Sequence, residues 1–221
     1  MKTNCNIIDL GKISYKKAYA YQRRIVDEIK LKLRSDTLVL CEHLPVITLG
    51  RTGKIENLNT DTKELKSKKI DFFRIDRGGD ITAHEPGQLT VYPIINLKAR
   101  KEPDIRLYLN NLQLVILNTL WDFGINAQLI KDKTGVWVKD KKIASIGVGI
   151  TQWITYHGLS INVTNSLETF SFIRPCGMDI GLTSLALELK GRIDFNQFKQ
   201  KVVDNFKEVF KLNFVAQPIA I

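Results

Sequence analysis

The sequence predicts an α/β protein of the α+β type, in which a mixed, largely antiparallel sheet is flanked by helices. Three segments carry apolar residues at helical spacing, and the chain between them consists of short runs rich in β-branched and aromatic residues. Helices and strands do not alternate regularly, as they would in a doubly wound fold, and short connections favour antiparallel neighbours. We therefore expect the helices to pack mainly on one side of the sheet.

The three expected helices have recognisable ends. The first follows Ser14, a suitable capping residue. The second begins near Asp104 and stops near Gly124, and the third begins near Asp194. We expect their apolar faces to pack in the core; these faces are formed by Tyr15, Ala18, Tyr19, Ile25, Val26 and Ile29, by Leu109, Leu112, Ile116 and Leu120, and by Phe195, Phe198, Val202, Phe206 and Val209.

Short runs between the helices are expected to form strands, because β-branched and aromatic side chains suit a sheet. These runs cover residues 37–43, 45–50, 71–75, 88–97, 135–140, 141–150 and 153–163. Asp140 and Lys141 form the expected tip of a hairpin that joins two of them.

The composition is that of a globular protein with a basic surface. The 221 residues are 44% hydrophobic and 25% charged, and 33 basic against 23 acidic residues give a formal net charge of +10. Because no internal repeat or long linker interrupts the chain, we expect one domain over residues 1–221. No basic run is interleaved with aromatic residues, so the charge alone is weak support for nucleic-acid binding, and we expect none.

The sequence gives no sign of export or membrane insertion. Its N-terminal segment lacks the apolar core of a secretory signal, and no run approaches the roughly 18 apolar residues of a membrane span. We therefore expect a cytoplasmic protein with no membrane partner.

One cysteine stands out from its neighbours in the chain. Cys176 lies between Pro175 and Gly177, which places it in a turn, and the positive charge of Arg174 would favour its thiolate. An unreactive turn cysteine is the equally weighted alternative. Cys41 lies in an apolar run and is expected to be a buried small hydrophobe. An odd number of widely spaced cysteines argues against disulfides and zinc; they are Cys5, Cys41 and Cys176.

A glycine-containing segment follows the strand expected at residues 71–75. Adjacent Gly78 and Gly79 let a ligand approach the backbone and leave N–H groups available to a carbonyl or an anion. A tight turn before the next strand is the alternative. The spacing matches neither a Walker A motif nor a dinucleotide-binding fingerprint.

Lys142 opens a strand with unusually small residues. Ala144, Ser145 and Gly147 fill little core space and leave room for a ligand. Lys141 and Lys142 point to opposite faces, so at most one of them reaches a given site. His43, His84 and His157 show no metal-ligand spacing, so no metal is assigned.

Taken together, these segments resemble the lipoyl(octanoyl) transferase family from about residue 38 to residue 185. The matching motifs occur in the same order, and only their combination is specific: Glu42-His43 with Thr48-Leu49-Gly50-Arg51, Arg77-Gly78-Gly79 with His84 and Pro86-Gly87-Gln88, Gly135-Val136-Trp137-Val138, Lys142-Ile143-Ala144, Thr155 with His157-Gly158 and Asn162, and Pro175-Cys176-Gly177.

The resemblance implies a fold like that of the biotin and lipoate ligase catalytic domain, with Cys176 as nucleophile and Lys142 as catalytic lysine. It implies that acyl substrate is bound by Arg77, Gly78, Gly79, Asp80, Ile81, Thr82, Ala83, His84, Ser145, Ile146, Gly147, Gly158, Leu159 and Ser160. The chain departs from the family in having Glu85, where glycine is usual, and Asp80, where glutamine is common.

The implied reaction moves an octanoyl group from octanoyl-acyl carrier protein to a lysine of a lipoyl domain through an acyl-cysteine, without a cofactor or a metal. The implied acceptors are the lipoyl domains of 2-oxoacid dehydrogenases and the glycine cleavage H protein, and we expect a monomer. Two alternatives stay open. One is an ATP-dependent lipoate or biotin ligase, which would not need Cys176. The other is a basic nucleic-acid-binding module, supported by charge alone.

Overall fold

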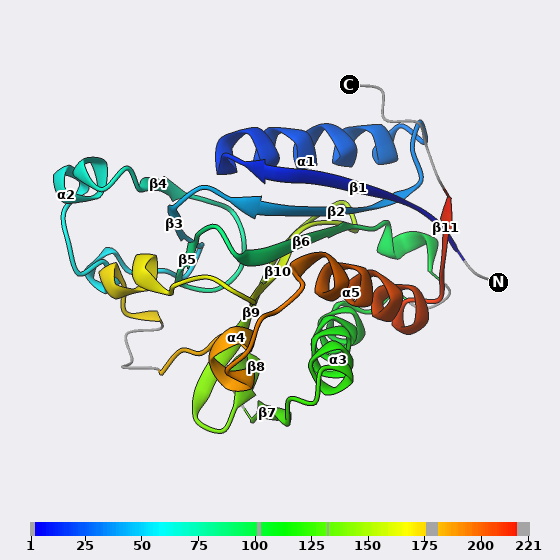
Figure 1. Ribbon diagram of the computed structural model, residues 1–221. Coiled ribbons are helices and arrows are strands. Elements are labelled where there is room, and N and C mark those ends of the chain that lie inside the picture. Colours follow the sequence, from blue (N-terminus) through cyan, green and yellow to red (C-terminus); the bar gives the residue numbers. More distant parts are fainter. Residues whose placement is uncertain (1–2, 101–102, 132, 176–180, 216–221) are drawn as a thin grey trace.

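The computed structural model describes residues 3–100, 103–131, 133–175 and 181–215 of the chain (Figure 1). Within them an eight-stranded sheet has the order β11-β1-β2-β6-β10-β9-β8-β7, and a second sheet has the order β4-β3-β5. The strands are β1 Thr3–Ile13, β2 Asp36–His43, β3 Val46–Leu49, β4 Asp71–Arg74, β5 Ile81–His84, β6 Gln88–Ile94, β7 Ala127–Ile130, β8 Lys133–Val138, β9 Lys141–Thr151, β10 Ile154–Asn162 and β11 Leu212–Val215.

The large sheet is mixed, as expected. β1 pairs in parallel with β11 and with β2, whereas the pairs from β2 through β6, β10, β9 and β8 to β7 are antiparallel. In the small sheet β3 pairs in parallel with β4 and antiparallel with β5. Short connections account for the antiparallel pairs among the consecutive strands β7, β8, β9 and β10.

Each of the three expected helices is present: α1 Tyr15–Lys30, α3 Ile105–Asp122 and α5 Phe195–Val209. The carboxylates of Asp104 and Asp194 accept hydrogen bonds from backbone N–H groups of the first turns that follow them. Ser14 occupies the capping position of α1, but its side chain makes no capping hydrogen bond. Short helices were not expected; they are α2 Thr62–Ser67, α4 Leu185–Leu189 and the 3₁₀ turns η1 Ile55–Asn57, η2 Leu97–Ala99 and η3 Glu168–Phe172.

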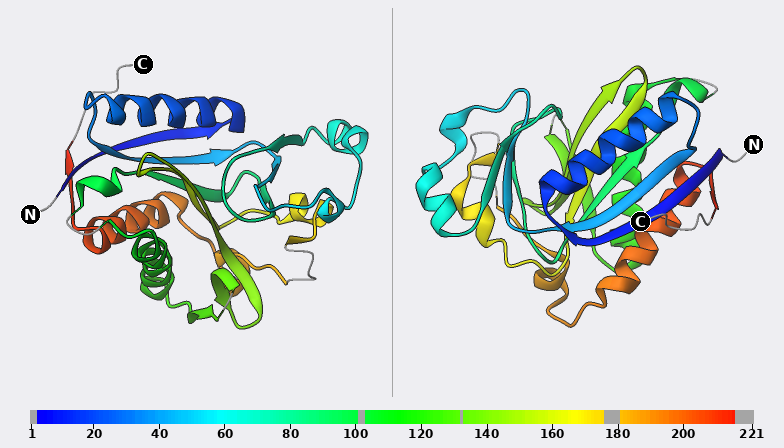
Figure 2. Two further views of the ribbon diagram at one scale, coloured as in Figure 1. Left: turned by 180° about the vertical axis from the view of Figure 1, so that it is seen from behind. Right: turned by 90° about the horizontal axis from the view of Figure 1, so that it is seen from above.

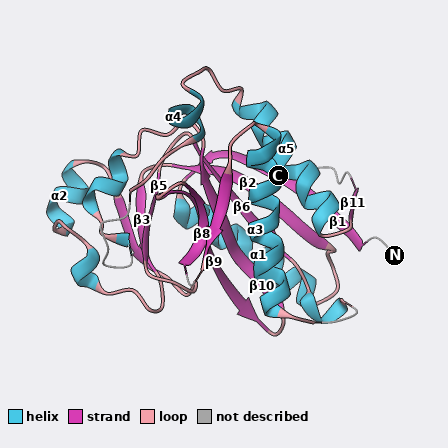
Figure 3. Cartoon of the chain, turned by 90° about the horizontal axis from the view of Figure 1, so that it is seen from below, coloured by secondary structure: helices cyan, strands magenta, loops and turns pink. Residues whose placement is uncertain are grey.

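The helices cover both faces of the large sheet, so the expectation of helices mainly on one side is wrong (Figures 1 and 2). Alternate residues of β2 explain the arrangement, since successive side chains point to opposite faces. Val39 and Cys41 belong to the core beneath α1, whereas Leu38 and Leu40 belong to the core shared with α3 and α5. Figure 3 shows α3 and α5 from below, lying over the strands.

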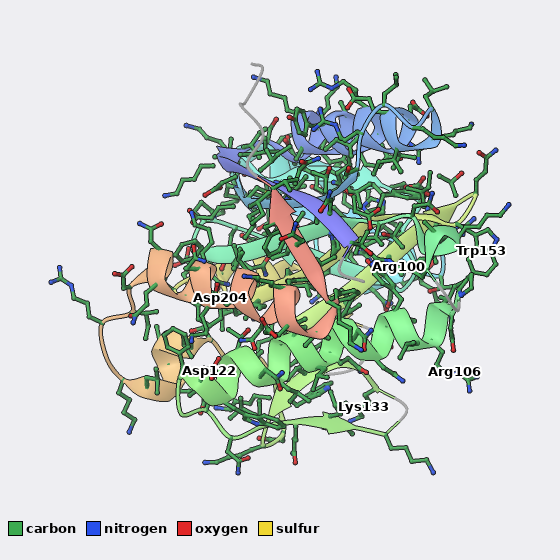
Figure 4. All side chains as sticks on the ribbon, turned by 90° about the vertical axis from the view of Figure 1, so that its right-hand side faces the viewer. Arg100, Arg106, Asp122, Lys133, Trp153 and Asp204 are labelled. Carbon is green, nitrogen blue, oxygen red and sulfur yellow. The ribbon has the colours of Figure 1, made fainter. Side chains whose placement is uncertain are left out.

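Polar contacts join elements that are distant in sequence. Asn205 of α5 donates to the Asp122 carboxylate of α3 over 3.0 Å, and Arg100 pairs with the largely buried Asp36 of β2 over 2.6 Å. Asp122 and Arg100 are labelled in Figure 4. Among the described helices, none combines the length and the apolar character that crossing a bilayer requires. The large sheet thus has a hydrophobic core on each of its two faces.

Candidate active site

A cavity of about 460 Å³ is lined by residues of both sheets. Its walls come from the loop before β5, from β5 itself, and from β6, β9 and β10, with Trp137 of β8 and Tyr15 of α1 beside them. Strands distant in sequence therefore supply one shared space, which is the usual way in which a sheet builds a substrate site.

Nearly all of the described residues expected to bind substrate line this cavity. They are Arg77, Gly78, Gly79, Asp80, Ile81, Thr82, His84, Ser145, Ile146, Gly147, Gly158, Leu159 and Ser160, and Lys142 lines it as well. Ala83 is the exception. Its side chain alternates away from the cavity along β5 and is fully buried in the core of the small sheet with Ile47 and Leu49. Cys176 lies outside the described residues.

The loop before β5 is fixed from two sides. Arg77 is 7% exposed, and its Nη2 donates to the Thr48 carbonyl over 2.8 Å and to the Thr48 hydroxyl over 3.0 Å. The Gly78 N–H donates to the Val148 carbonyl over 2.8 Å, which seats the loop directly on β9. Gly79 has a φ of +84°, a conformation that glycine adopts without strain. The expected Gly-Gly feature is thus a fixed wall of the cavity.

Gly147 provides the close approach between β9 and this loop. A Cβ at position 147 would lie 3.0 Å from Arg77 Cδ and 3.0 Å from the Gly78 carbonyl oxygen. We expect Gly147→Ala to push the loop outward and to lower the transfer rate about tenfold while the protein stays folded. Steady-state rates and melting temperatures of this variant, measured beside Gly191→Ala, test this, because position 191 has its nearest neighbouring atom at 3.6 Å. Wild-type activity in Gly147→Ala would contradict it.

Lys142 reaches the cavity, and Lys141 does not. Lys142 is half-buried and lines the cavity, whereas Lys141 is exposed. The Lys142 ammonium lies 5.6 Å from the centre of the Trp137 ring, which favours a cation. Gly135 makes room for the lysine stem, because a Cβ there would lie 2.5 Å from Lys142 Cε.

The chain on each side of Cys176 borders the same cavity. On one side the Arg174 N–H donates to the Asn57 carbonyl over 2.7 Å, and Pro175 lines the cavity. On the other side Leu182 lines the cavity and pairs with Lys142 as an isolated parallel bridge. The described residues on each side of residues 176–180 are therefore anchored at the cavity that holds Lys142.

A cluster of buried tyrosine and histidine rings lies at the cavity and beside it. The sequence alone did not indicate that these residues lie together. Tyr15, Tyr92, His84 and His157 all line the cavity. His43 Nδ1 faces the Ile13 carbonyl at 3.1 Å, and its Nε2 faces the Tyr92 hydroxyl at 2.6 Å. Nδ1 therefore donates and Nε2 accepts, which assigns the neutral tautomer.

The Asp76 carboxylate is hydrogen-bonded to His157 of this ring cluster and to two tyrosines beside it. Its carboxylate accepts from Tyr19 over 3.1 Å and from Tyr156 over 2.8 Å, and it lies 3.0 Å from His157 Nε2. The hydrogen bond with His157, followed by that from Tyr156, holds the pKa of Asp76 well below its usual value. Burial is the largest cause that lowers the pKa of His157, and Asp76 opposes it. These hydrogen bonds therefore connect α1, β10 and the loop before β5.

The buried histidines predict a pH-dependent stability. Burial lowers the pKa of His43 to about 4 and that of His84 to about 3, from an ordinary 6.5. The unfolded chain therefore binds more protons below pH 6.5, so the free energy of unfolding falls as the pH drops from 6.5 towards 4. Each histidine contributes at most about 1.4 kcal/mol per pH unit.

Urea unfolding at pH 7, 6 and 5 measures this slope, and His43→Gln should make it shallower. An equal slope in wild type and His43→Gln would contradict the assignment of a neutral, buried His43.

The described residues contain no cluster of three or more His, Cys, Asp or Glu side chains that could hold a metal ion. The fold is shared with the catalytic domains of lipoate and biotin ligases. The chain belongs to the lipoyl protein ligase A/B catalytic domain family, whose model matches residues 14–207.

Similar sequences agree with that family. The octanoyltransferase of Clostridium kluyveri is 40% identical over 206 residues, which cover 93% of this chain and 88% of that protein. The octanoyltransferase of Solibacter usitatus is 41% identical over 207 residues, which cover 94% and 93%.

Among solved structures, lipoate-protein ligase A bound with ATP has a TM-score of 0.81 at 15% identity, with 100% of this chain and 90% of that chain covered. The biotin protein ligase of Aquifex aeolicus has a TM-score of 0.53 at 16% identity, with 96% and 70% covered. These two structures are similar to this chain in fold, whereas the two octanoyltransferases are similar to it in sequence along nearly the whole chain.

Proposed function

We propose that this acyltransferase moves an octanoyl group from octanoyl-acyl carrier protein to a lysine of lipoyl domains through an acyl-cysteine on Cys176. The chain is an octanoyltransferase of protein lipoylation, like its relatives at about 40% identity. The observation that carries the covalent mechanism is that Lys142, the Arg77–Gly79 loop and both described flanks of Cys176 border one cavity. Lipoyl-domain proteins are the acceptors that fit this family.

The chemistry divides into two exchanges at one carbonyl carbon. In the first, the Cys176 thiolate attacks the donor thioester, a new C–S bond forms, and the carrier thiol leaves and takes a proton. In the second, the amine of the acceptor lysine attacks the acyl-cysteine, a C–N bond forms, and the Cys176 sulfur leaves. The first exchange is nearly balanced in energy and the second is downhill, so neither needs ATP.

Lys142 serves both exchanges in this proposal. As an ammonium group it stabilises the Cys176 thiolate, and as a proton carrier it protonates the departing carrier thiolate and later accepts a proton from the attacking amine. In this proposal the Arg77–Gly79 loop forms the cavity wall along which the substrate's acyl group lies. The acyl tail is recognised by contact area, since each buried methylene contributes about 0.8 kcal/mol.

The rival function is an ATP-dependent ligase, which the fold likeness to lipoate-protein ligase A favours. The deciding experiment supplies a lipoyl domain with either octanoyl-acyl carrier protein alone or free octanoate with Mg-ATP. The proposed function predicts rapid modification with the carrier and none with octanoate and ATP. The reverse result would establish a ligase.

The net charge of +10 predicts a salt-dependent encounter with the donor. If the carrier and acceptor proteins are acidic, a basic surface speeds and orients their binding, and salt weakens this because the Debye length is only about 10 Å at 0.1 M. We expect the apparent KM for the carrier to rise severalfold between about 0.05 and about 0.3 M salt, while kcat changes little. A salt-independent KM would exclude electrostatic docking.

A further inference from the structure

The two carboxylates at the ends of β5 bind the chain that leads to Cys176. Asp80 immediately precedes β5 and Glu85 immediately follows it. Asp80 was expected to bind substrate, and the sequence assigned Glu85 no part in the site. Both carboxylates accept hydrogen bonds that support residues 165–174, Glu85 directly and Asp80 through Asn57.

Glu85 holds the start of η3. It is 4% exposed; its Oε1 accepts from the Asn165 side-chain amide over 3.1 Å and from the Leu167 N–H over 2.5 Å, and its Oε2 accepts from the Thr169 N–H over 2.8 Å. A buried carboxylate is costly unless such donors satisfy it, so these bonds fix the chain at this point. Leu167, in a left-handed conformation with a φ of +67°, turns the chain into η3.

Asp80 supports the later part of the same segment, residues 172–174, through Asn57. Its Oδ2 accepts from the Asn57 side-chain amide over 2.5 Å, and its Oδ1 accepts from the Lys54 N–H over 3.2 Å. The Asn57 carbonyl in turn accepts from the Arg174 N–H over 2.7 Å.

Two more contacts extend this pairing. The Asn59 N–H donates to the Phe172 carbonyl over 2.9 Å, and Leu58 pairs with Ile173 as an antiparallel bridge. Residues 57–59 therefore hold residues 172–174 in register, one residue before Pro175 lines the cavity.

We propose that Asp80 and Glu85 are positioning residues that hold the two ends of residues 165–175 and so set the position of Pro175, the residue before Cys176. β5 is a stable support for both carboxylates, because it is paired with β3 along its whole length and its Thr82 and His84 line the cavity. β5 therefore forms part of the cavity wall, and the carboxylates at its two ends support the residues that precede Cys176. This inference rests on the proposed role of Cys176.

The test compares single-turnover acylation of the full-length enzyme by octanoyl-acyl carrier protein, followed by intact mass, in Asp80→Ala, Asp80→Asn, Glu85→Ala and Glu85→Gln. We expect the alanine variants to acylate about tenfold to a hundredfold more slowly, with less than about a twofold change in the half-saturating donor concentration. The amide variants keep one accepting oxygen and should fall between alanine and wild type. Glu56→Gln is the matched control, since Glu56 is an exposed carboxylate beside Asn57.

Hydrogen exchange separates local support from general destabilisation. In Glu85→Ala the amides of Leu167 and Thr169 should exchange faster, while those of β6 and β10 keep their protection. If an alanine variant does not fold, the amide variant of the same residue carries the test.

Wild-type acylation rates in folded Asp80 and Glu85 variants would overturn the inference and leave the proposed function intact. A loss confined to the half-saturating concentration would also overturn it, by making these residues substrate contacts. Absence of any acyl adduct on Cys176 in the wild type would instead contradict the proposed function itself.

Discussion

Cys176→Ser should abolish octanoyl transfer, lowering the rate by about 10³-fold or more while leaving the fold intact. The reason is chemical. A hydroxyl has a far higher pKa than a thiol, so a nearby ammonium that stabilises a thiolate does not produce an alkoxide. An ester would also be a poorer acyl donor to the acceptor amine than a thioester. Transfer rates and circular dichroism of the variant measure the two parts of this expectation.

Cys41→Ser is the matched control. Cys41 is 2% exposed beneath α1, with its sulfur 3.5 Å from His43 Nε2, and burial raises the pKa of its thiol far above the usual range. Such a thiol is inert at neutral pH. The serine variant should therefore transfer octanoyl normally and lose about 1 kcal/mol of stability from the buried hydroxyl. Loss of transfer in Cys41→Ser with full activity in Cys176→Ser would reverse the assignment of the nucleophile.

Lys142→Ala should lower transfer by about 10²- to 10³-fold, because it removes both the charge beside the cavity and the proton carrier. Lys141→Ala is the neighbouring control and should change little, since that side chain is exposed on the other face of β9. The pH dependence of iodoacetamide alkylation at Cys176 reports the thiol pKa, which we expect to rise in Lys142→Ala.

Lys142→Arg separates the two roles of the lysine. Arginine keeps the charge but does not exchange its proton near neutral pH. We expect Lys142→Arg to restore much of the alkylation profile and little of the transfer. An unchanged alkylation profile together with full transfer in Lys142→Ala would remove Lys142 from the mechanism.

Local patterns predicted the parts of the fold that depend on local physics. The helices α1, α3 and α5 begin directly after Ser14, Asp104 and Asp194. Apolar spacing and, at the two aspartates, side-chain capping depend on residues only a few positions apart, so the sequence predicts them. Strand alternation predicted that at most one of Lys141 and Lys142 reaches the site, and the family resemblance selected Lys142.

Those local patterns could not predict which strands pair when they are far apart in the sequence. β1 was not expected, since it is held by a parallel partner, β11, at the other end of the chain, and its own register shifts between Asp9 and Lys12. β5 is only four residues long and follows two glycines, which indicated a turn. Short strands of this kind are defined by their partners more than by their own composition.

The candidate site was predictable where a motif had an unusual composition, as in the small residues of β9. It was not predictable where the chemistry depends on tertiary contacts. Asp76 looks like an ordinary loop carboxylate in the sequence, yet it joins Tyr19 and Tyr156 from two other elements. Glu85 is similar, because only the fold shows that its carboxylate holds the chain before Cys176.

The most direct test of the account is the intact mass of the wild-type enzyme after incubation with octanoyl-acyl carrier protein and no acceptor. The account predicts a mass increase of one octanoyl group, located on the Cys176 peptide, removed by hydroxylamine, and lost at the rate of product formation when a lipoyl domain is added. Transfer that proceeds without this adduct, or an adduct on another residue, would contradict it.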